Sequence, residues 1–228
     1  MQHTLTTIAT VHSPYPQKFG VARQPGLVPA AEVRIELNPE FNADSVRGLE
    51  AFDYVWISFI FHGVLDEGWS PLVRPPRLGG KQKMGVFATR SPHRPNHLGL
   101  SLLKLERIDS GKTISLICSG ADLLDGTPVV DIKPYIPFVE AKPAAAAGFA
   151  NSKPPELAVN WQPDCDDAAL TPAERALISQ SVAQDPRPAY QDIPERVYVM
   201  SVAGYEVKFQ IQSNAANIIA VEPKHRSA

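Results

Sequence analysis

The order of apolar and polar residues predicts a chain built mostly of β-strands. In residues 31–37, AEVRIEL, the side chains of Val33, Ile35 and Leu37 fall on one face and charged side chains on the other, which is the period of a half-buried strand. Residues 53–61, DYVWISFIF, are almost continuously apolar and predict a strand buried on both faces. Turn-forming residues separate four further predicted strands, HLGLSLLKLERI, KTISLICSG, TPVVDIKPYI and ELAVNW. Such spacing is typical of a closed or nearly closed antiparallel barrel.

Helical signals are confined to two segments. NADSVRGLEAF predicts only a short helical turn. TPAERALISQSVAQ, residues 171–184, predicts a helix with Thr171 as its N-cap, Pro172 at its first position and Glu174 completing a capping box. We expect this helix to stop at Asp185, because a proline follows.

Small residues and prolines replace the apolar alternation in residues 140–155, which predicts a loop or linker. Beyond it, RVYVMSVAGYEVKFQIQ predicts a hairpin that turns at Ala203-Gly204, and NIIAVEP predicts a closing strand. We therefore expect a mainly β protein in which residues 1–155 form a single-sheet antiparallel β-barrel domain. Residues 156–228 are expected to form a small C-terminal α+β domain.

The chain has 228 residues, of which 44% are hydrophobic, enough for a substantial core. Its 22 prolines favour many short strands and turns over long helices. The amino terminus lacks a basic and then apolar leader, and no run of about 18 apolar residues occurs, so we expect a soluble, cytoplasmic protein without membrane contact. Cys118 and Cys165 suggest neither a disulfide framework nor a zinc site; we expect no metal, and a core position for Cys118.

Positive charge is concentrated in one segment of a chain whose net charge is -2. Residues 71–105 contain no Asp or Glu, and their cationic side chains are Arg74, Arg77, Lys81, Lys83, Arg90, Arg94 and Lys104, with the imidazoles of His93 and His97. This composition favours a site for an anion and a nucleobase.

The centre of this segment is MGVFATRSPHRPNHLGLS, residues 84–101. Arg90 and Arg94 suit bidentate capture of a carboxylate or phosphate, and the amide of Asn96 suits an adenine edge. Two prolines order the loop in advance and so reduce the entropy lost on binding. The alternative is a solvated basic loop.

Two shorter motifs are each ambiguous when taken alone. In VARQPGL, Pro25-Gly26 is a turn signal, and Gly26 either permits close backbone approach to a ligand or serves a purely structural turn. His62 ends an apolar strand and is either a residue of the barrel rim or a catalytic group.

Two loops add polar candidates. ADLLDGTPVVDIKPYIPF has an Asp-Gly turn before a strand, and Asp125 either forms a plain hairpin turn or accepts hydrogen bonds from a ligand. QDPRPAY places Asp185, Arg187 and Tyr190 in a proline-stiffened loop, where an arginine beside an aromatic ring favours a stacked base or a phosphate.

The common cofactor fingerprints do not occur. The chain has no G-x-G-x-x-G after a strand, no phosphate-binding G-x-x-x-x-G-K-[ST] and no H-E-x-x-H, so a nucleotide-like cofactor would have to bind in another way. It also lacks paired carboxylates for glycoside chemistry and a G-x-S-x-G elbow, which disfavours common hydrolases.

Taken in order, the motifs SPY, RQPGL, VRGLEAFDYVWISFIFH, RPPRLGG, MGVFATRSPHRPNHLGLS, DLLDGTPVVDIKPYIPF and QDPRPAY resemble the TrmO family over nearly the whole chain. The resemblance implies an S-adenosylmethionine-dependent tRNA methyltransferase that acts on N6 of threonylcarbamoyl-adenosine at position 37, in the tRNA anticodon loop. It also implies a single-sheet β-barrel and a homodimer.

The same resemblance assigns the candidate residues. Around S-adenosylmethionine it places Gln24, Pro25, Gly26, His62, Gly63, Arg90, Leu100, Asp125, Gly126, Thr127 and Pro128. Bordering the target base, as catalytic residues, it places Arg94, Asn96, Lys133 and Tyr135. Holding the tRNA it places Asp185, Arg187 and Tyr190. The chain departs from the family at His93 and His97, where an aromatic residue and a proline are frequent.

Methyl transfer from a sulfonium needs an aligned amine in a dry pocket more than a strong base, and proximity alone can supply about 7 to 11 kcal/mol. The residues found fit that chemistry. Two other classes of function stay open from the residues: a non-catalytic RNA-binding module, and a barrel that binds an adenine-containing ligand as a sensor.

Overall fold

The computed structural model describes residues 3–188, 191, 193 and 195–224, and in it six antiparallel strands close into a barrel. The order around the barrel is β1-β2-β7-β6-β3-β8. The strands are β1 (Ala9–His12), β2 (Val33–Leu37), β3 (Tyr54–Ile60), β6 (Leu98–Ser110), β7 (Ile114–Ser119) and β8 (Pro128–Pro134). The predicted antiparallel barrel is thereby confirmed.

The barrel core follows the alternation seen in the sequence. Val33, Ile35 and Leu37 of β2 are buried, as predicted. The prediction that β3 is buried on both faces was wrong, because alternate residues are buried and the others are partly exposed. Those partly exposed residues include Trp56 and Ser58, which border a cavity instead of a second apolar layer.

The C-terminal part is a four-stranded sheet in the order β10-β11-β12-β9, covered by one helix. The elements are β9 (Ala158–Trp161), α2 (Pro172–Ala183), β10 (Val197–Val202), β11 (Tyr205–Gln212) and β12 (Ala215–Pro223). The predicted hairpin is confirmed, with positive φ angles of 51° at Ala203 and 82° at Gly204. ELAVNW, grouped above with the barrel strands, contains β9 and pairs in parallel with β12 instead.

The helix α2 begins and ends as the sequence predicts. The Thr171 side chain accepts a hydrogen bond from the backbone N–H of Glu174, and Glu174 accepts one from the backbone of Thr171. The remaining elements are short: η1 (Ala43–Val46), η2 (Leu49–Ala51), η3 (His62–Glu67), β4 (Leu72–Val73), η4 (Pro76–Leu78), β5 (Met84–Gly85), η5 (Val86–Ala88), α1 (Pro137–Glu140) and η6 (Gly148–Ala150). Among the described residues, none of the helices combines the length and the apolar composition that a membrane crossing requires.

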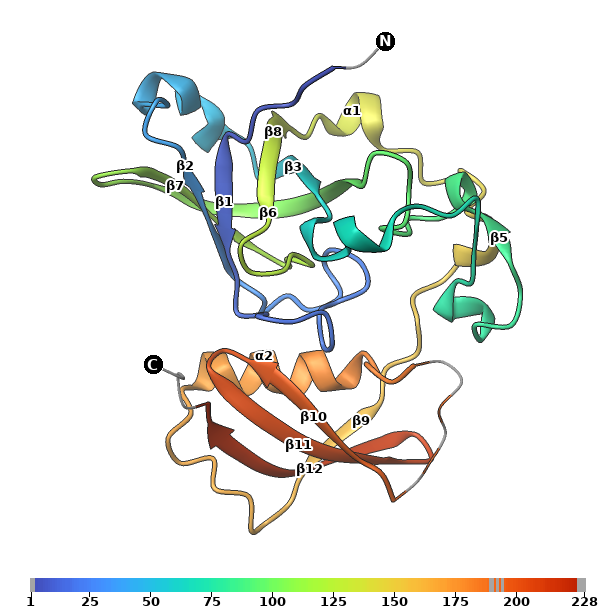
Figure 1. Ribbon diagram of the computed structural model, residues 1–228. Coiled ribbons are helices and arrows are strands. Elements are labelled where there is room, and N and C mark those ends of the chain that lie inside the picture. Colours follow the sequence, from blue (N-terminus) through green and yellow to red (C-terminus); the bar gives the residue numbers. More distant parts are fainter. Residues whose placement is uncertain (1–2, 189–190, 192, 194, 225–228) are drawn as a thin grey trace.

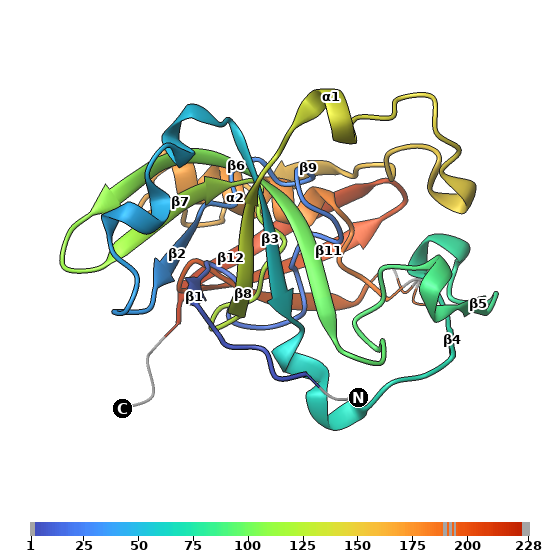
Figure 2. The ribbon, with the colours of Figure 1, turned by 90° about the horizontal axis from the view of Figure 1, so that it is seen from above.

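The barrel lies over the C-terminal sheet, with α2 on the sheet face that is turned toward it (Figure 1 and, turned by 90°, Figure 2). A segment close to the amino terminus joins the second core: Tyr15, Val28 and Ala31 are buried among residues of α2 and the sheet. The Tyr15 hydroxyl lies 2.8 Å from Oγ of Ser181 in α2. The division of the chain into two domains at residue 155 stays a prediction. Residues 15–31 belong to the N-terminal side of that division, yet they contribute Tyr15, Val28 and Ala31 to the core of the C-terminal part.

Both cysteines are buried. Cys118 packs in the barrel core, as predicted, and Cys165 in the core of the C-terminal sheet. Desolvation raises the pKa of the Cys118 thiol to about 12, so this thiol stays protonated and acts as an apolar side chain.

Candidate functional site

A cavity of about 760 Å³ opens beside β3 and β6. Four loops complete its wall, around residues 18–24, 61–64, 89–94 and 122–127. Gly99 is needed in this wall, because a Cβ atom there would lie 2.2 Å from the ring of Phe59. The volume falls in the range of small-molecule sites, roughly 300 to 1,000 Å³.

Two arginines of the loop after η5 line the cavity with neutral hydrogen-bond partners. Arg90 Nη1 donates to Oε1 of Gln24 at 2.7 Å, which joins the loop to the RQPG turn. Arg94 Nη1 donates to the carbonyl oxygens of Thr89 and Ser91, at 3.2 and 3.5 Å. Since these acceptors carry no charge, both guanidinium groups keep their attraction for an anionic ligand.

The structure brings together most of the residues expected around a cofactor. Seven of the predicted site residues line the cavity: Gln24, His62, Gly63, Arg90, Arg94, Leu100 and Thr127. The others expected around the cofactor lie beside them in the chain: Pro25 and Gly26 after Gln24, Asp125 and Gly126 in the turn before Thr127, and Pro128 at the start of β8.

The RQPG turn and the turn before Thr127 are fixed by backbone contacts. Gly26, at φ 80°, donates its N–H to the carbonyl of Gly120 at 2.8 Å. Asp125 Oδ1 accepts the N–H of Ser13 at 2.8 Å, so at least one of its oxygens serves the turn itself. Gly126, at φ 75°, lies against His62, whose Nε2 is 4.0 Å from the position of a Cβ on that glycine. Thr127 is held in the wall by its own turn, because its backbone N–H and its hydroxyl both donate to the carbonyl of Leu124, at 3.2 and 2.7 Å.

Three residues expected at the target base lie outside the wall that the described residues form. Asn96 is exposed in the turn between Arg94 and His97. Lys133 pairs with Asp131 on β8. The ring of Tyr135 contacts Trp56 edge to face, with centroids 6.2 Å apart, and Trp56 lines the cavity. Lys133 lies opposite Trp56 in the register of β3 and β8, so Lys133 and Tyr135 both neighbour Trp56 at one edge of the cavity.

Asp122 is a wall residue that the sequence analysis missed. Its Oδ1 accepts a hydrogen bond of 2.6 Å from Ser101, which is only 1% exposed. Desolvation raises the pKa of Asp122 from 3.8 to about 6, against the lowering effects of the Ser101 hydrogen bond and the charge of Arg90. The signal available in the sequence was a lone carboxylate inside an apolar run, LICSGADLL.

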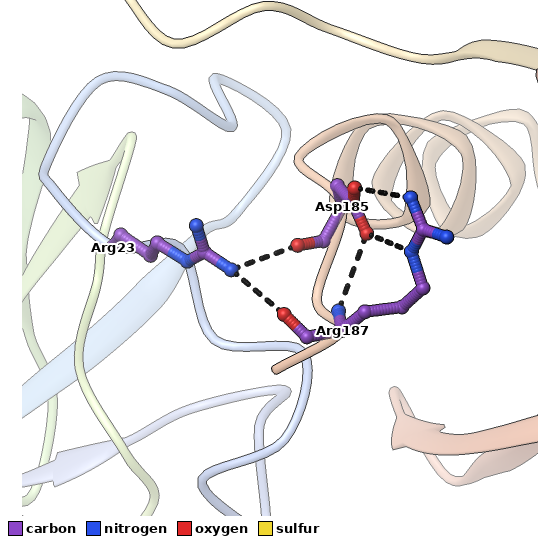
Figure 3. Close-up of polar contacts among 3 residues, drawn as sticks. All are labelled: Arg23, Asp185 and Arg187. Carbon is purple, nitrogen blue, oxygen red and sulfur yellow. Dashed lines mark hydrogen bonds and ion pairs between the residues drawn. The ribbon is translucent and has the colours of Figure 1, made fainter. Parts of the chain in front are cut away.

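Asp185 and Arg187, in the loop after α2, contact Arg23 of the N-terminal segment, and these three residues form the junction after α2 (Figure 3). Arg23, a cavity residue, donates through Nη2 to the carbonyl oxygens of Asp185 and Arg187, at 2.9 and 3.1 Å. The Arg187 guanidinium pairs with the Asp185 carboxylate through Nε and Nη2, each at 2.8 Å, and its side chain is 12% exposed. Burial lowers the pKa of Arg23 and the charge of Asp185 opposes this. Tyr190 lies outside the described residues.

The chemistry of the wall suits a zwitterionic ligand with a flat apolar part. Guanidinium groups offer donors to a carboxylate, and Phe59, Phe61 and Leu100 offer apolar contact. Within the described ranges, no three His, Cys, Asp or Glu residues gather in a way that would hold a metal ion.

Comparison with known proteins gives consistent matches. Residues 10–141 match the family described as tRNA-methyltransferase O N-terminal domain, and residues 154–224 match the TrmO C-terminal domain. A protein of Eikenella corrodens named tRNA (adenine(37)-N6)-methyltransferase is 63% identical over 171 residues, which cover 75% of this chain and 97% of that protein. A Pseudomonas aeruginosa protein that carries the name of an S-adenosylmethionine-dependent methyltransferase is 45% identical over 198 residues, 84% of each. The crystal structure of TrmO from Pseudomonas aeruginosa is similar with a TM-score of 0.81 and 35% identity, over 97% of this chain and 98% of that one.

Proposed function

The chain belongs to the TrmO family, and from this we propose that it methylates N6 of threonylcarbamoyl-adenosine at position 37 of tRNA. An S-adenosylmethionine-dependent tRNA (adenine(37)-N6)-methyltransferase is the enzyme class of its relatives and of this chain. The observation that carries the proposal is the cavity itself, in which Arg90 and Arg94 stand with uncharged partners beside an apolar wall.

The wall fits S-adenosylmethionine by its donor set. Arg90 and Gln24 offer polar contacts, Leu100 an apolar one, and Thr127 with the Asp125-Gly126 turn a compact backbone surface. We assign cofactor binding to these residues together with His62 and Gly63, and with Pro25, Gly26 and Pro128, which follow Gln24 and Thr127 in the chain. When bound, S-adenosylmethionine supplies an electrophilic methyl carbon, whose transfer to N6 leaves a neutral thioether and releases the N6 proton.

The threonylcarbamoyl group carries a carboxylate, and Arg94 is the proposed reader of it. Arg94 lines the cavity, and its loop is ordered by the backbone hydrogen bond of 3.0 Å from His97 N–H to the carbonyl of Arg94. We assign the target base to Asn96, Lys133 and Tyr135, of which Lys133 and Tyr135 neighbour the wall residue Trp56. An anticodon-loop base is already unpaired, so presenting it costs a few kcal/mol or less.

We assign the tRNA backbone mainly to the basic segment. Arg74, Lys81 and Lys83 are exposed around β4 and β5, which extend to one side of the barrel in both ribbon views (Figures 1 and 2). Exposed cations of this kind bind phosphates by releasing counterions. A direct tRNA contact from Asp185, Arg187 and Tyr190 stays a prediction; the carbonyl oxygens of Asp185 and Arg187 accept hydrogen bonds from Arg23.

A homodimer that acts in the cytoplasm completes the proposal. Large apolar side chains are exposed outside the barrel strands, with Phe87 in η5 at 78% and Phe138 in α1 at 87%. Surfaces of this kind are enriched at subunit contacts. Sedimentation of the wild-type chain and of Phe138→Ser measures whether these side chains hold two copies together.

The enzymatic test uses S-adenosylmethionine labelled in its methyl group and tRNA from cells without the endogenous activity, prepared with and without the threonylcarbamoyl group. We expect label only in threonylcarbamoyl-adenosine, read by mass spectrometry of nucleosides. Equal methylation of unmodified adenosine 37 would contradict the proposed carboxylate recognition. Retention of the donor without transfer would indicate a sensor, and tRNA binding without donor retention would indicate an RNA-binding module.

A further inference from the structure

The charges on the cavity wall are strongly unequal. Four cationic side chains line it: Lys18, Arg23, Arg90 and Arg94. Among the described residues of the wall, Asp122 is the one carboxylate. Lys18 is compensated by Glu67 outside the wall, and Arg23 lies near the charge of Asp185. Arg90 and Arg94 are wall cations without a carboxylate hydrogen-bond partner among the described residues, and Asp122 is the wall group that attracts a positive ligand.

Asp122 is held in place without an ion pair among the described residues. Its neighbours come from separate elements: Ser101 on β6 donates to it, and Arg90 acts on it through its charge. A desolvated carboxylate without a cationic hydrogen-bond partner costs stability. A bound cation would supply the missing partner.

The proposed donor brings two cationic centres. Its ammonium stands next to the donor's own carboxylate, whereas its sulfonium has no internal counter-charge. Resting on the proposed function, we propose that the Asp122 carboxylate is the counter-charge of the sulfonium and makes the cavity select the charged donor over the neutral product. Loss of the methyl group removes the sulfonium charge, so this attraction ends with transfer and the product leaves more easily.

The test is calorimetric binding to the full chain, wild type and Asp122→Asn, of three ligands: S-adenosylmethionine, S-adenosylhomocysteine, and an analogue in which a charged amine replaces the sulfonium. We expect the Kd of both cationic ligands to rise about tenfold or more, as for a close charge pair, and that of S-adenosylhomocysteine to change by less than about threefold.

The control is Glu67→Gln, which removes an equal charge outside the wall, where Glu67 pairs with Lys18 at 2.7 Å. We expect it to leave the discrimination between donor and product unchanged. If the Kd of the cationic ligands rises equally in Asp122→Asn and Glu67→Gln, the inference is overturned. Such a result would mean that any lost negative charge near the cavity weakens these ligands, without a specific role for Asp122. Should Asp122→Asn fail to fold, Ser101→Ala is the second variant, and a smaller selective loss of the cationic ligands is expected.

Other outcomes separate this inference from the proposed function. Suppose that the wild type binds the donor and that Asp122→Asn weakens the binding of all three ligands equally, or of none. The assignment of Asp122 is then overturned, and the proposed function is not. Unchanged binding with lost turnover would make Asp122 a proton acceptor and likewise overturn it. A wild-type protein that binds none of the three ligands would overturn both.

Discussion

The charges at the cavity wall and those at the junction after α2 are arranged in opposite ways. Arg90 and Arg94 donate to neutral oxygens, and Asp122 accepts from a neutral hydroxyl. Arg187, by contrast, forms a double contact with Asp185 and is almost covered.

The loop after η5, which carries Arg94, and the loop after α2, which carries Arg187, have similar sequences. Each has an arginine between prolines, so composition alone does not separate the two loops. What separates them is a carboxylate two residues before Arg187, which satisfies that guanidinium within the chain. A charge kept without a charged partner is available to a ligand and costs stability, whereas a compensated charge stabilises the fold. Substitutions should therefore divide by region: binding is lost at the wall and stability at the junction.

The largest effect is expected for Arg90→Ala. Removing a guanidinium that a bound ligand would cover should weaken S-adenosylmethionine binding by about 2 to 5 kcal/mol, with little change in the free energy of unfolding. The measurement is calorimetric titration, and Arg74→Ala, in the exposed approach segment, is the matched control. A comparable loss of donor binding in both variants would mean that the whole segment acts as one diffuse field.

The next effect is a gain in stability, which we expect for Asp122→Asn. The native pKa of Asp122, about 6, lies above the ordinary 3.8, so the folded protein holds this proton more tightly than the unfolded chain. Its free energy of unfolding therefore falls as pH rises from about 4 to 6 and stays low above. Asp122→Asn should raise the free energy of unfolding of the ligand-free protein at pH 8 by about 1 to 3 kcal/mol, and by less at pH 5. Urea titrations at both pH values measure this, and a destabilised variant at pH 8 would contradict it.

Arg187→Ala should act in the other direction. It leaves the Asp185 carboxylate without its partner and should lower the free energy of unfolding by about 1 to 2 kcal/mol. The control is Arg107→Ala, because Arg107 pairs with Asp109 at the same spacing but is 55% exposed, and should cost no more than about 0.5 kcal/mol. Thermal unfolding compares the two.

The same variant tests the junction against RNA binding. If Arg187 serves the fold, the slope of log tRNA affinity against log salt stays as in the wild type. A slope reduced by about one unit would instead show that Arg187 contacts a phosphate. The loop after α2 would then bind a ligand, as we propose for the loop after η5.

The smallest effect is expected for Thr171→Ala at the start of α2. The loss of its hydrogen bond to Glu174 N–H should lower the free energy of unfolding by about 1 kcal/mol. Donor affinity should stay unchanged, because the side-chain hydrogen bonds of this cap, among the described residues, join Thr171 to Glu174, and neither residue lines the cavity. Thr171→Ser keeps the hydroxyl and should restore most of the stability; urea unfolding measures both.

Local patterns in the sequence were sufficient for most of the fold. The period of β2 placed Val33, Ile35 and Leu37 in the core, and the capping box at Thr171 placed the start of α2. The reading of β3 as doubly buried failed because an apolar run looks the same whether its second face meets a core or a ligand cavity. The parallel pairing of β9 with β12 joins segments more than 50 residues apart, which no local pattern records.

For the candidate site, motifs placed the loops but not their partners. Arg90 and Gln24 lie 66 residues apart and meet only because the loops converge on one wall. Asp122 was missed because its importance comes from Ser101, on a neighbouring part of the closed barrel, and from desolvation that the sequence does not display.

The packing of Tyr15 against Ser181 also bears on how the protein is made. The two residues are 166 positions apart, and at roughly 5 to 20 residues per second the ribosome needs on the order of 10 to 30 s to pass from one to the other. During that interval the segment that carries Arg23 and Gln24 lacks the core on which it packs. The wall of the cavity that we assign to the methyl donor is therefore expected to be complete only after α2 has emerged and folded.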